Sequence, residues 1–175
     1  MIDVYHKISE AFQCQNTICV VLRNAIDSYL VGKIEYYNHD GILLYNIDYR
    51  GVATCHVYIS IEEIEEIAEK QYYINKINTL LELRESKREF LAFPYKAGLK
   101  KDFLNWIYSN HKLIEITFED EQFEGYVNKI EDSFIDINKI CTFTGKDEGH
   151  VIIRDEYLTY FSVETSFSES VKLFL

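Results

Sequence analysis

Histidine is the side chain best suited to acid–base chemistry near neutral pH, and the chain has five of them, widely separated. They are His6, His39, His56, His111 and His150. Histidine catalysis requires a carboxylate to orient the ring and a nucleophile or metal ion beside it, and no motif brings these residue types together. Neither of the phosphate-binding glycine loops, GxGxxG and GxxxxGK, occurs. The sequence therefore predicts a protein that is not an enzyme and holds no cofactor.

Thiol chemistry is the second possibility, because the chain has four cysteines. They are Cys14, Cys19, Cys55 and Cys141, and no pair has the CxxC spacing. We expect reduced thiols that pack inside the protein, as is usual in the cytoplasm. The alternative is a zinc site made from Cys14, Cys19 and Cys55 with the adjacent His56. Nothing in the spacing requires it, so the sequence predicts no metal.

One stretch of the sequence occurs twice. HVYISIEEIEEI runs from His56 to Ile67, and HVIIRDEYLTYF runs from His150 to Phe161. Four of the aligned pairs are identical, and three further pairs are apolar in both copies. We interpret the similarity as the sign of an internal duplication. Because each histidine begins a predicted strand, we expect a shared packing or hydrogen-bonding role for both.

Charge is distributed unevenly along the chain. The protein carries a formal net charge of −11, which disfavours general attraction to nucleic acid. Between residues 68 and 112, however, nine basic residues accompany five acidic ones. The basic residues that are candidates for binding single-stranded nucleic acid are Arg84, Lys87, Arg88, Lys96, Lys100 and Lys101. Aromatic residues interleave with them, which suits stacking on bases. The alternative is that these charges are solvated or pair with acidic parts of the same chain.

Four further residues are candidates for contacting a nucleic acid. Asn38 and His39 lie in a predicted turn and have side chains that can hydrogen-bond a base, although asparagine is also a common turn residue. Tyr37, just before the turn, either stacks on a base or packs in the core. Arg154 is the basic residue of the second repeated stretch, but the two acidic residues that follow it would repel a phosphate.

The elements that position these residues follow from the hydrophobic spacing. Helices are predicted after Asp3 and over residues 69–89 and 100–110. Strands are predicted over residues 17–23, 29–38, 41–48, 52–60, 113–118, 122–131, 134–140, 150–155 and 157–164. Residues 61–67 fit both a helix and a strand. Gly32 and Gly125 each lie in a long strand that bends. The same order of elements thus occurs on both sides of a helical connector.

The stretch GKIEYYNHDGILLY, from Gly32 to Tyr45, is similar to the first signature of the Sm and Sm-like (LSm) proteins, in particular that of the bacterial RNA chaperone Hfq. His56 to Ile67 resembles the second signature, and the second copy fits more loosely around Gly125. The resemblance implies small five-stranded barrels that hold RNA in their loops, with SH3-like barrels as the competing fold. The sequence departs from the family at Ile59 and Ser60, where Hfq has a basic residue and a histidine, and four acidic residues follow closely.

We therefore predict a mainly β protein with helices, made of two tandem Sm-like (SH3-like) five-stranded barrels, each preceded by a short helix. The first barrel spans residues 1–68, a helical connector spans 69–99, and the second barrel spans 100–175 and ends in an extra strand over 166–175 that covers one edge. The predicted function is a binding or regulatory module for protein–protein interaction, including self-association, through exposed edge strands. Binding of single-stranded RNA is the alternative. The sequence shows no leader and no long apolar run, which predicts a cytoplasmic location away from membranes.

Overall fold

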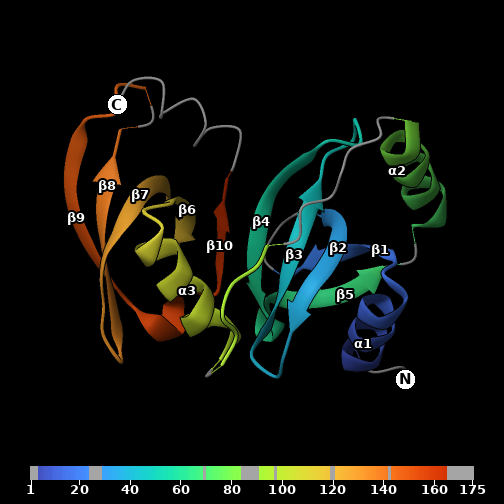
Figure 1. Ribbon diagram of the computed structural model, residues 1–175, viewed down its shortest axis with the longest axis horizontal. Coiled ribbons are helices and arrows are strands. Elements are labelled where there is room, and N and C mark those ends of the chain that lie inside the picture. Colours follow the sequence, from blue (N-terminus) through green and yellow to red (C-terminus); the bar gives the residue numbers. More distant parts are fainter. Residues whose placement is uncertain are drawn as a thin grey trace.

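Ten strands form one continuous antiparallel sheet in this computed structural model (Figure 1). The structure describes residues 4–23, 29–68, 70–83, 91–96, 98–118, 121–141 and 143–164. The first half contains α1 (Val4–Cys14), β1 (Thr17–Leu22), β2 (Tyr29–Tyr37), β3 (Gly41–Ile47), β4 (Ala53–Ser60), the 3-10 turn η1 (Ile61–Glu63), β5 (Ile64–Ala68) and α2 (Gln71–Leu83). The second half contains α3 (Leu99–Ser109), β6 (Leu113–Phe118), β7 (Glu121–Ile130), β8 (Phe134–Ile140), β9 (Asp147–Arg154), the 3-10 turn η2 (Asp155–Tyr157) and β10 (Tyr160–Val163).

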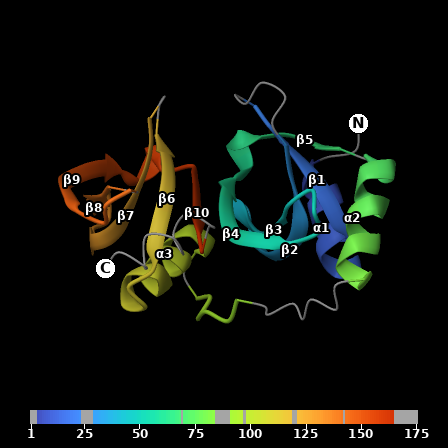
Figure 2. The same ribbon diagram turned by 90° about the horizontal axis from the view of Figure 1, so that it is seen from above.

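The strand order across the sheet is β5-β1-β2-β3-β4-β10-β6-β7-β8-β9. Both halves therefore have the same internal order, because β10 lies beside β6 as β5 lies beside β1. The halves are joined where β4 pairs with β10, with His56 opposite Val163 and Ile59 opposite Tyr160. We call this pairing the β4–β10 junction. Figure 2 shows the sheet curling on either side of it.

The prediction of two separate five-stranded Sm-like or SH3-like barrels is wrong, because all ten strands belong to one open sheet. The fold class of tandem Sm-like, LSm or Hfq-like barrels is therefore corrected to a single large antiparallel sheet with helices. Alternation of apolar and polar residues predicts where a strand forms, but it does not reveal which distant strand pairs with it. The extra strand predicted over 166–175 lies outside the described residues.

The helices occur where the spacing predicts them, with shifted ends. The described part of the 69–89 prediction contains α2, and the 100–110 prediction corresponds to α3. Residues 61–67, which fitted both a helix and a strand, form η1 and most of β5. Within the described ranges, no helix is long and apolar enough to cross a membrane.

Both long strands bend at a glycine, as the sequence predicts. A Cβ atom at Gly32 would collide with the backbone carbonyl of Tyr45, and one at Gly125 would collide with that of Asn138. A β-bulge follows each glycine in β2 and in β7. Glycine and bulge together allow a strand to curl, so each half of the sheet wraps around its own apolar side chains.

Two large apolar clusters and two smaller ones fill the described part of the protein. One large cluster lies inside the first half and joins residues of α1 to the inner faces of β1 to β5. The other large cluster joins α3 and β6 to β10 with Leu43 and Tyr58, which come from β3 and β4. The strands β3 and β4 therefore bury side chains on both faces, because the second half covers their outer face.

Candidate functional site

Tyr37, the tyrosine considered for stacking on a base, packs within the protein, as does its neighbour Tyr36. The Tyr37 hydroxyl lies 3.1 Å from Oγ of Ser9, and its ring lies 5.1 Å from the ring of Phe12. The Tyr36 hydroxyl donates to the backbone carbonyl of Leu91 at 3.0 Å. Tyr37, the residue predicted as a nucleic-acid contact, is therefore occupied by packing between α1 and β2.

The turn between β2 and β3 is held by Asn38. Its Oδ1 accepts hydrogen bonds from the backbone N–H of Asp40 at 2.9 Å and of Gly41 at 3.0 Å. The neighbouring His39 is exposed and lies 3.1 Å from the Asp40 carboxylate. Asn38 thus makes the turn, which was the alternative to a base contact, and His39 remains at the surface.

Lysines of the predicted basic surface form ion pairs with carboxylates of the same chain. Lys100 lies 3.1 Å from the carboxylate of Asp155 and also donates to its backbone carbonyl. Lys101 lies 3.2 Å from the carboxylate of Asp132. Lys96 is exposed before α3. Two of the three described candidate lysines, Lys100 and Lys101, therefore pair with acidic turns of the second half.

Arg154 is the one candidate that lies on a strand edge. Its guanidinium lies 3.4 Å from Glu156 and 6.0 Å from the centre of the Phe134 ring. The remaining candidates, Arg84, Lys87 and Arg88, lie outside the described residues. The described candidates are thus dispersed over a turn, the start of α3 and the end of β9, and they do not form one basic surface.

The cysteines do not assemble a metal site in the described ranges, where no cluster of three or more histidine, cysteine or acidic side chains has metal-binding geometry. All four thiols are free. Burial raises the pKa of the Cys19 thiol and of the Cys55 thiol above their ordinary values. A raised pKa keeps the thiol protonated, which suits packing and opposes metal binding. The zinc site considered from the sequence is therefore not supported.

The repeated histidines lie in matching places but in different surroundings. His56 lies opposite Tyr45 in β3, and His150 lies opposite Asn138 in β8. The side chain of His56 is 7% exposed, whereas that of His150 is 54% exposed and lies 3.1 Å from Asp136. Both rings place Nδ1 at hydrogen-bonding distance from a carboxylate, Glu35 for His56 and Asp136 for His150, so the shared hydrogen-bonding role is observed, whereas a shared packing role is not.

His56 belongs to a network that ties the two halves together. Its Nδ1 lies 2.8 Å from Oε2 of the buried Glu35, and its Nε2 lies 3.7 Å from Glu164. Glu164 also pairs with Lys112 at 2.6 Å, and Leu91 N–H donates to Glu35 at 3.3 Å. These residues come from β2, β4, the connector and both ends of the second half, so the network stabilises the β4–β10 junction.

The described sheet ends at β5 on one side and at β9 on the other. An edge strand presents unpaired backbone N–H and C=O groups, which can accept a strand from another protein. These two edges are therefore the places where the protein can extend its sheet.

The outward backbone groups of β9 follow from its pairing with β8. The N–H of Asp155 donates to the carbonyl of Ser133 at 3.0 Å, one position beyond the pair Arg154–Phe134. Residues that face the partner strand alternate with residues that face away in an antiparallel ladder. The N–H and C=O groups of His150, Ile152 and Arg154 therefore point away from β8. We call this row of groups the β9 edge.

The matching row in the first half is already used by the chain itself. Ser60, which matches Arg154 in the repeat, donates its N–H to the carbonyl of Thr159 at 2.8 Å. Tyr58, which matches Ile152, is 1% exposed and lies opposite Phe161. Ile152 itself is 68% exposed. The β9 edge thus has the geometry that β4 uses to bind β10, together with an exposed apolar side chain at its centre.

The β5 edge is protected. The ammonium group of Lys7 donates to the backbone carbonyl of Ile67 at 3.1 Å. Exposed Glu65 and Glu66 add negative charge to the same strand. Charged side chains on an edge oppose strand addition, so β9 is the more accessible of the two edges.

A hollow of about 460 Å³ lies at the end of β9. Its lining residues are Asp132, Ser133, Phe134, Arg154, Asp155 and Glu156. Three carboxylates and one guanidinium therefore surround the ring of Phe134, which is partly exposed. The hollow combines an apolar floor with an acidic rim.

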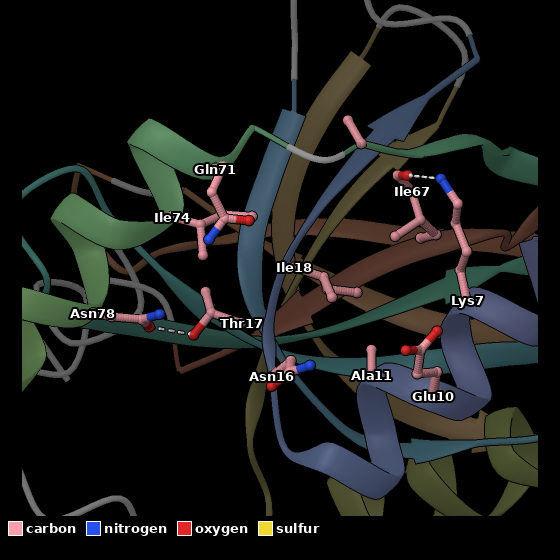
Figure 3. A pocket seen from close by; sticks show the side chains of 11 residues that line it. Lys7, Glu10, Ala11, Asn16, Thr17, Ile18, Ile67, Gln71, Ile74 and Asn78 are labelled. Atoms are coloured by element: carbon pink, nitrogen blue, oxygen red, sulfur yellow. Dashed lines mark hydrogen bonds between the residues drawn. The ribbon is translucent and has the colours of Figure 1, made fainter.

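A smaller pocket of about 290 Å³ lies between α1 and α2, where β5 leaves β1 (Figure 3). Thr17 donates to the Asn78 side chain at 2.6 Å across it, and Lys7 reaches the Ile67 carbonyl at its other side. Because these central polar groups hydrogen-bond each other, the pocket is a weaker candidate than the β9 edge.

No protein-family model, no curated protein and no solved structure matches this chain. The candidate site therefore depends on the geometry of the β9 edge alone. Sequence reasoning singled out Arg154 for its charge and missed Ile152. The available signal was the difference between the two repeated stretches, in which Ile152 replaces a tyrosine.

Proposed function

We propose that the protein is a non-enzymatic protein-interaction module that binds an extended segment of a partner along the β9 edge. The observation that carries the proposal is the outward row of backbone groups at His150, Ile152 and Arg154, beside the exposed side chain of Ile152. Strand addition provides affinity through main-chain hydrogen bonds and specificity through alternate side chains. The chain binds its own β10 to β4 in the same manner.

Protein partners are favoured over single-stranded RNA by the charges around the candidate residues. Lys100, Lys101 and Arg154 each lie near a carboxylate of the same chain, and the net charge is −11. Binding to phosphates depends on clustered, available cations. We further propose a cytoplasmic location, where free thiols such as the four in this chain persist.

The experiment that tests this function uses two substitutions at one position. Arg154 has φ −64°, which proline adopts without strain, and its N–H faces away from β8. Arg154→Pro removes that N–H, whereas Arg154→Ala removes the same side chain and keeps the N–H. Extended peptides would be selected from a randomised library with the full chain, and their affinities measured for both variants.

Selected peptides are expected to bind Arg154→Pro about tenfold more weakly than Arg154→Ala, because one main-chain hydrogen bond is lost. Hydrogen exchange at Ile152 and Arg154 is expected to slow when a peptide binds. Equal affinity for the two variants would contradict binding at this edge. Submicromolar, salt-sensitive binding of A-rich or U-rich RNA in fluorescence anisotropy would instead favour single-stranded RNA binding as the function.

A further inference from the structure

We infer that the segment bound at the β9 edge has an apolar centre and a lysine or arginine at each end, one of which enters the hollow beside Phe134. This inference rests on the proposed function and names the chemistry of the partner. It follows from the apolar centre of β9, from the acidic residues at both of its ends, and from the acidic β5 edge on the opposite side of the sheet.

The centre of β9 is apolar. Val151 and Ile153 turn toward the core, and Ile152 is exposed on the outer face. A partner strand places its side chains directly beside those of β9, and apolar cross-strand pairs stabilise such contacts. An apolar residue of the partner opposite Ile152 would remove both side chains from water.

The first end of β9 is acidic. Asp147 and Glu148 are both exposed. Asp147 accepts a hydrogen bond from the N–H of Gly149 at 2.6 Å, whereas the Glu148 carboxylate makes no hydrogen bond or ion pair with any residue that the structure describes. A basic side chain of the partner would therefore find an available carboxylate at Glu148.

The other end of β9 leads into the hollow. A lysine or arginine consists of an apolar stem and a charged head, which matches the Phe134 floor and the acidic rim. Lys100 and Lys101 approach two of the rim carboxylates from α3, and the third, Glu156, is shared with Arg154 at 3.4 Å. Glu156 is 64% exposed and retains acceptor positions for a second cation.

A second copy of the chain is a poor occupant. The strand of a second copy that would repeat the β4–β10 junction is β5, and its Ile67 carbonyl is already bound by Lys7. The exposed Glu65 and Glu66 of β5 would also approach the acidic ends of β9. Like charges across an interface disfavour a partner, so the occupant is a different protein with basic residues.

The probes are three short peptides of alternating threonine and valine that differ at one feature each. The first has lysine at both ends, the second has glutamate at both ends, and the third has lysine ends but serine in place of valine. Binding to the full chain would be measured by fluorescence anisotropy at low salt. The lysine-ended valine peptide is expected to bind about tenfold more tightly than either other peptide.

Three charge variants locate the ends. Glu148→Lys and Glu156→Lys are each expected to weaken the lysine-ended peptide about threefold, because one attraction becomes a repulsion. The matched control is Glu82→Lys, an equal charge change in α2 on the far side of the molecule (Figure 1), which is expected to leave binding unchanged. Arg154→Ala is expected to tighten binding about twofold, because a competing cation leaves the hollow.

The outcomes separate this inference from the proposed function. Equal or tighter binding of the glutamate-ended peptide, still weakened by Arg154→Pro, would overturn the basic partner and leave edge binding intact. Absence of binding for all peptides at millimolar concentration would overturn both. Concentration-dependent dimerisation that Arg154→Pro abolishes would show that a second copy is the occupant, and would overturn the inference.

Discussion

The strands β4 and β9 hold matching places in the two halves, yet β4 lies in the middle of the described sheet and β9 at its end. Both strands pair with the preceding strand in the same register, and both begin the repeated stretch with histidine. They differ in what covers their other side. The same strand scaffold therefore forms an internal junction in one half and an edge of the described sheet in the other, and the side chains on the outer faces differ accordingly in exposure.

The outer faces of the two halves differ in polarity. Leu43 in β3 is buried under the second half, and its counterpart in β8, by register, is Asp136. Tyr58 is likewise replaced by the exposed Ile152. Polar residues on β8 make it unfavourable to pack a further helix there, because their desolvation would cost free energy. The second half thus terminates the sheet in a way that permits only narrow, edge-on contact.

The largest expected difference is between Tyr58→Ala and Ile152→Ala. The Tyr58 ring is fully buried and stacks on Phe161 at 5.1 Å, so its removal is expected to lower the free energy of unfolding by about 4 kcal/mol. Ile152→Ala is expected to change it by less than about 0.5 kcal/mol. Urea denaturation of both variants measures the difference. Similar losses would mean that the face of β9 is as covered as that of β4.

A smaller difference is expected between the two histidines. His56→Ala leaves the Glu35 carboxylate buried without its imidazole partner, which is expected to cost about 3 kcal/mol. His150→Ala removes only an exposed contact with Asp136, and less than about 1 kcal/mol is expected. Adding Glu35→Gln to His56→Ala should recover part of the loss in the same denaturation experiment. No recovery would contradict the buried charge as the cause.

Proline sharpens the comparison at a single backbone group. Ser60 and Arg154 have φ −62° and −64°, so both accept proline without strain. Ser60→Pro removes the hydrogen bond to Thr159 and is expected to destabilise the protein by about 1–2 kcal/mol. Arg154→Pro removes no described backbone hydrogen bond, only the exposed side-chain contact with Glu156, and is expected to change stability by less than about 0.5 kcal/mol. The melting temperatures of both variants would be measured by circular dichroism. Equal decreases for Ser60→Pro and Arg154→Pro would show that the β9 edge is already paired.

The smallest expected effect is a pH dependence of the second half. The hydrogen bond from Asn128, followed by that from His150, holds the pKa of Asp136 below its usual range. A depressed folded pKa contributes stability at neutral pH that is lost as the pH falls through that pKa. Asn128→Ala should raise the pKa of Asp136 in an NMR titration. An unchanged pKa would show that Asn128 is not the main cause.

Most single elements of this fold are predictable from the sequence. Gly32 and Gly125 mark the bends of β2 and β7, and helical spacing around Phe103 marks α3. These features depend on near neighbours in the chain, which a local pattern records. Residues 61–67 stayed ambiguous because Ile64 and Ile67 suit either periodicity; pairing with β1 places these two isoleucines in β5, whereas residues 61–63 form η1.

The β4–β10 junction and the candidate site were not predictable in the same way. Strand alternation does not encode pairing between distant strands, so two separate barrels fitted the pattern equally well. Arg154 was selected for its side-chain charge, whereas its outward N–H depends on the register with Phe134. The second half has Asp136 at the position where the first half has Leu43, and both residues can be read in the sequence. The difference indicates that only one outer face is covered, but the two residues are recognised as counterparts only when the strand register is known.

The β4–β10 junction also has a consequence for synthesis on the ribosome. Translation reaches β10 about a hundred residues after β4, which takes about 5–20 s at about 5–20 residues per second. During that interval the nascent chain exposes the backbone edge of β4 together with Tyr58, which later stacks on Phe161. Unpaired edges of this kind promote association between nascent chains. The interval before β10 is synthesised is therefore one in which the nascent chain is exposed to association.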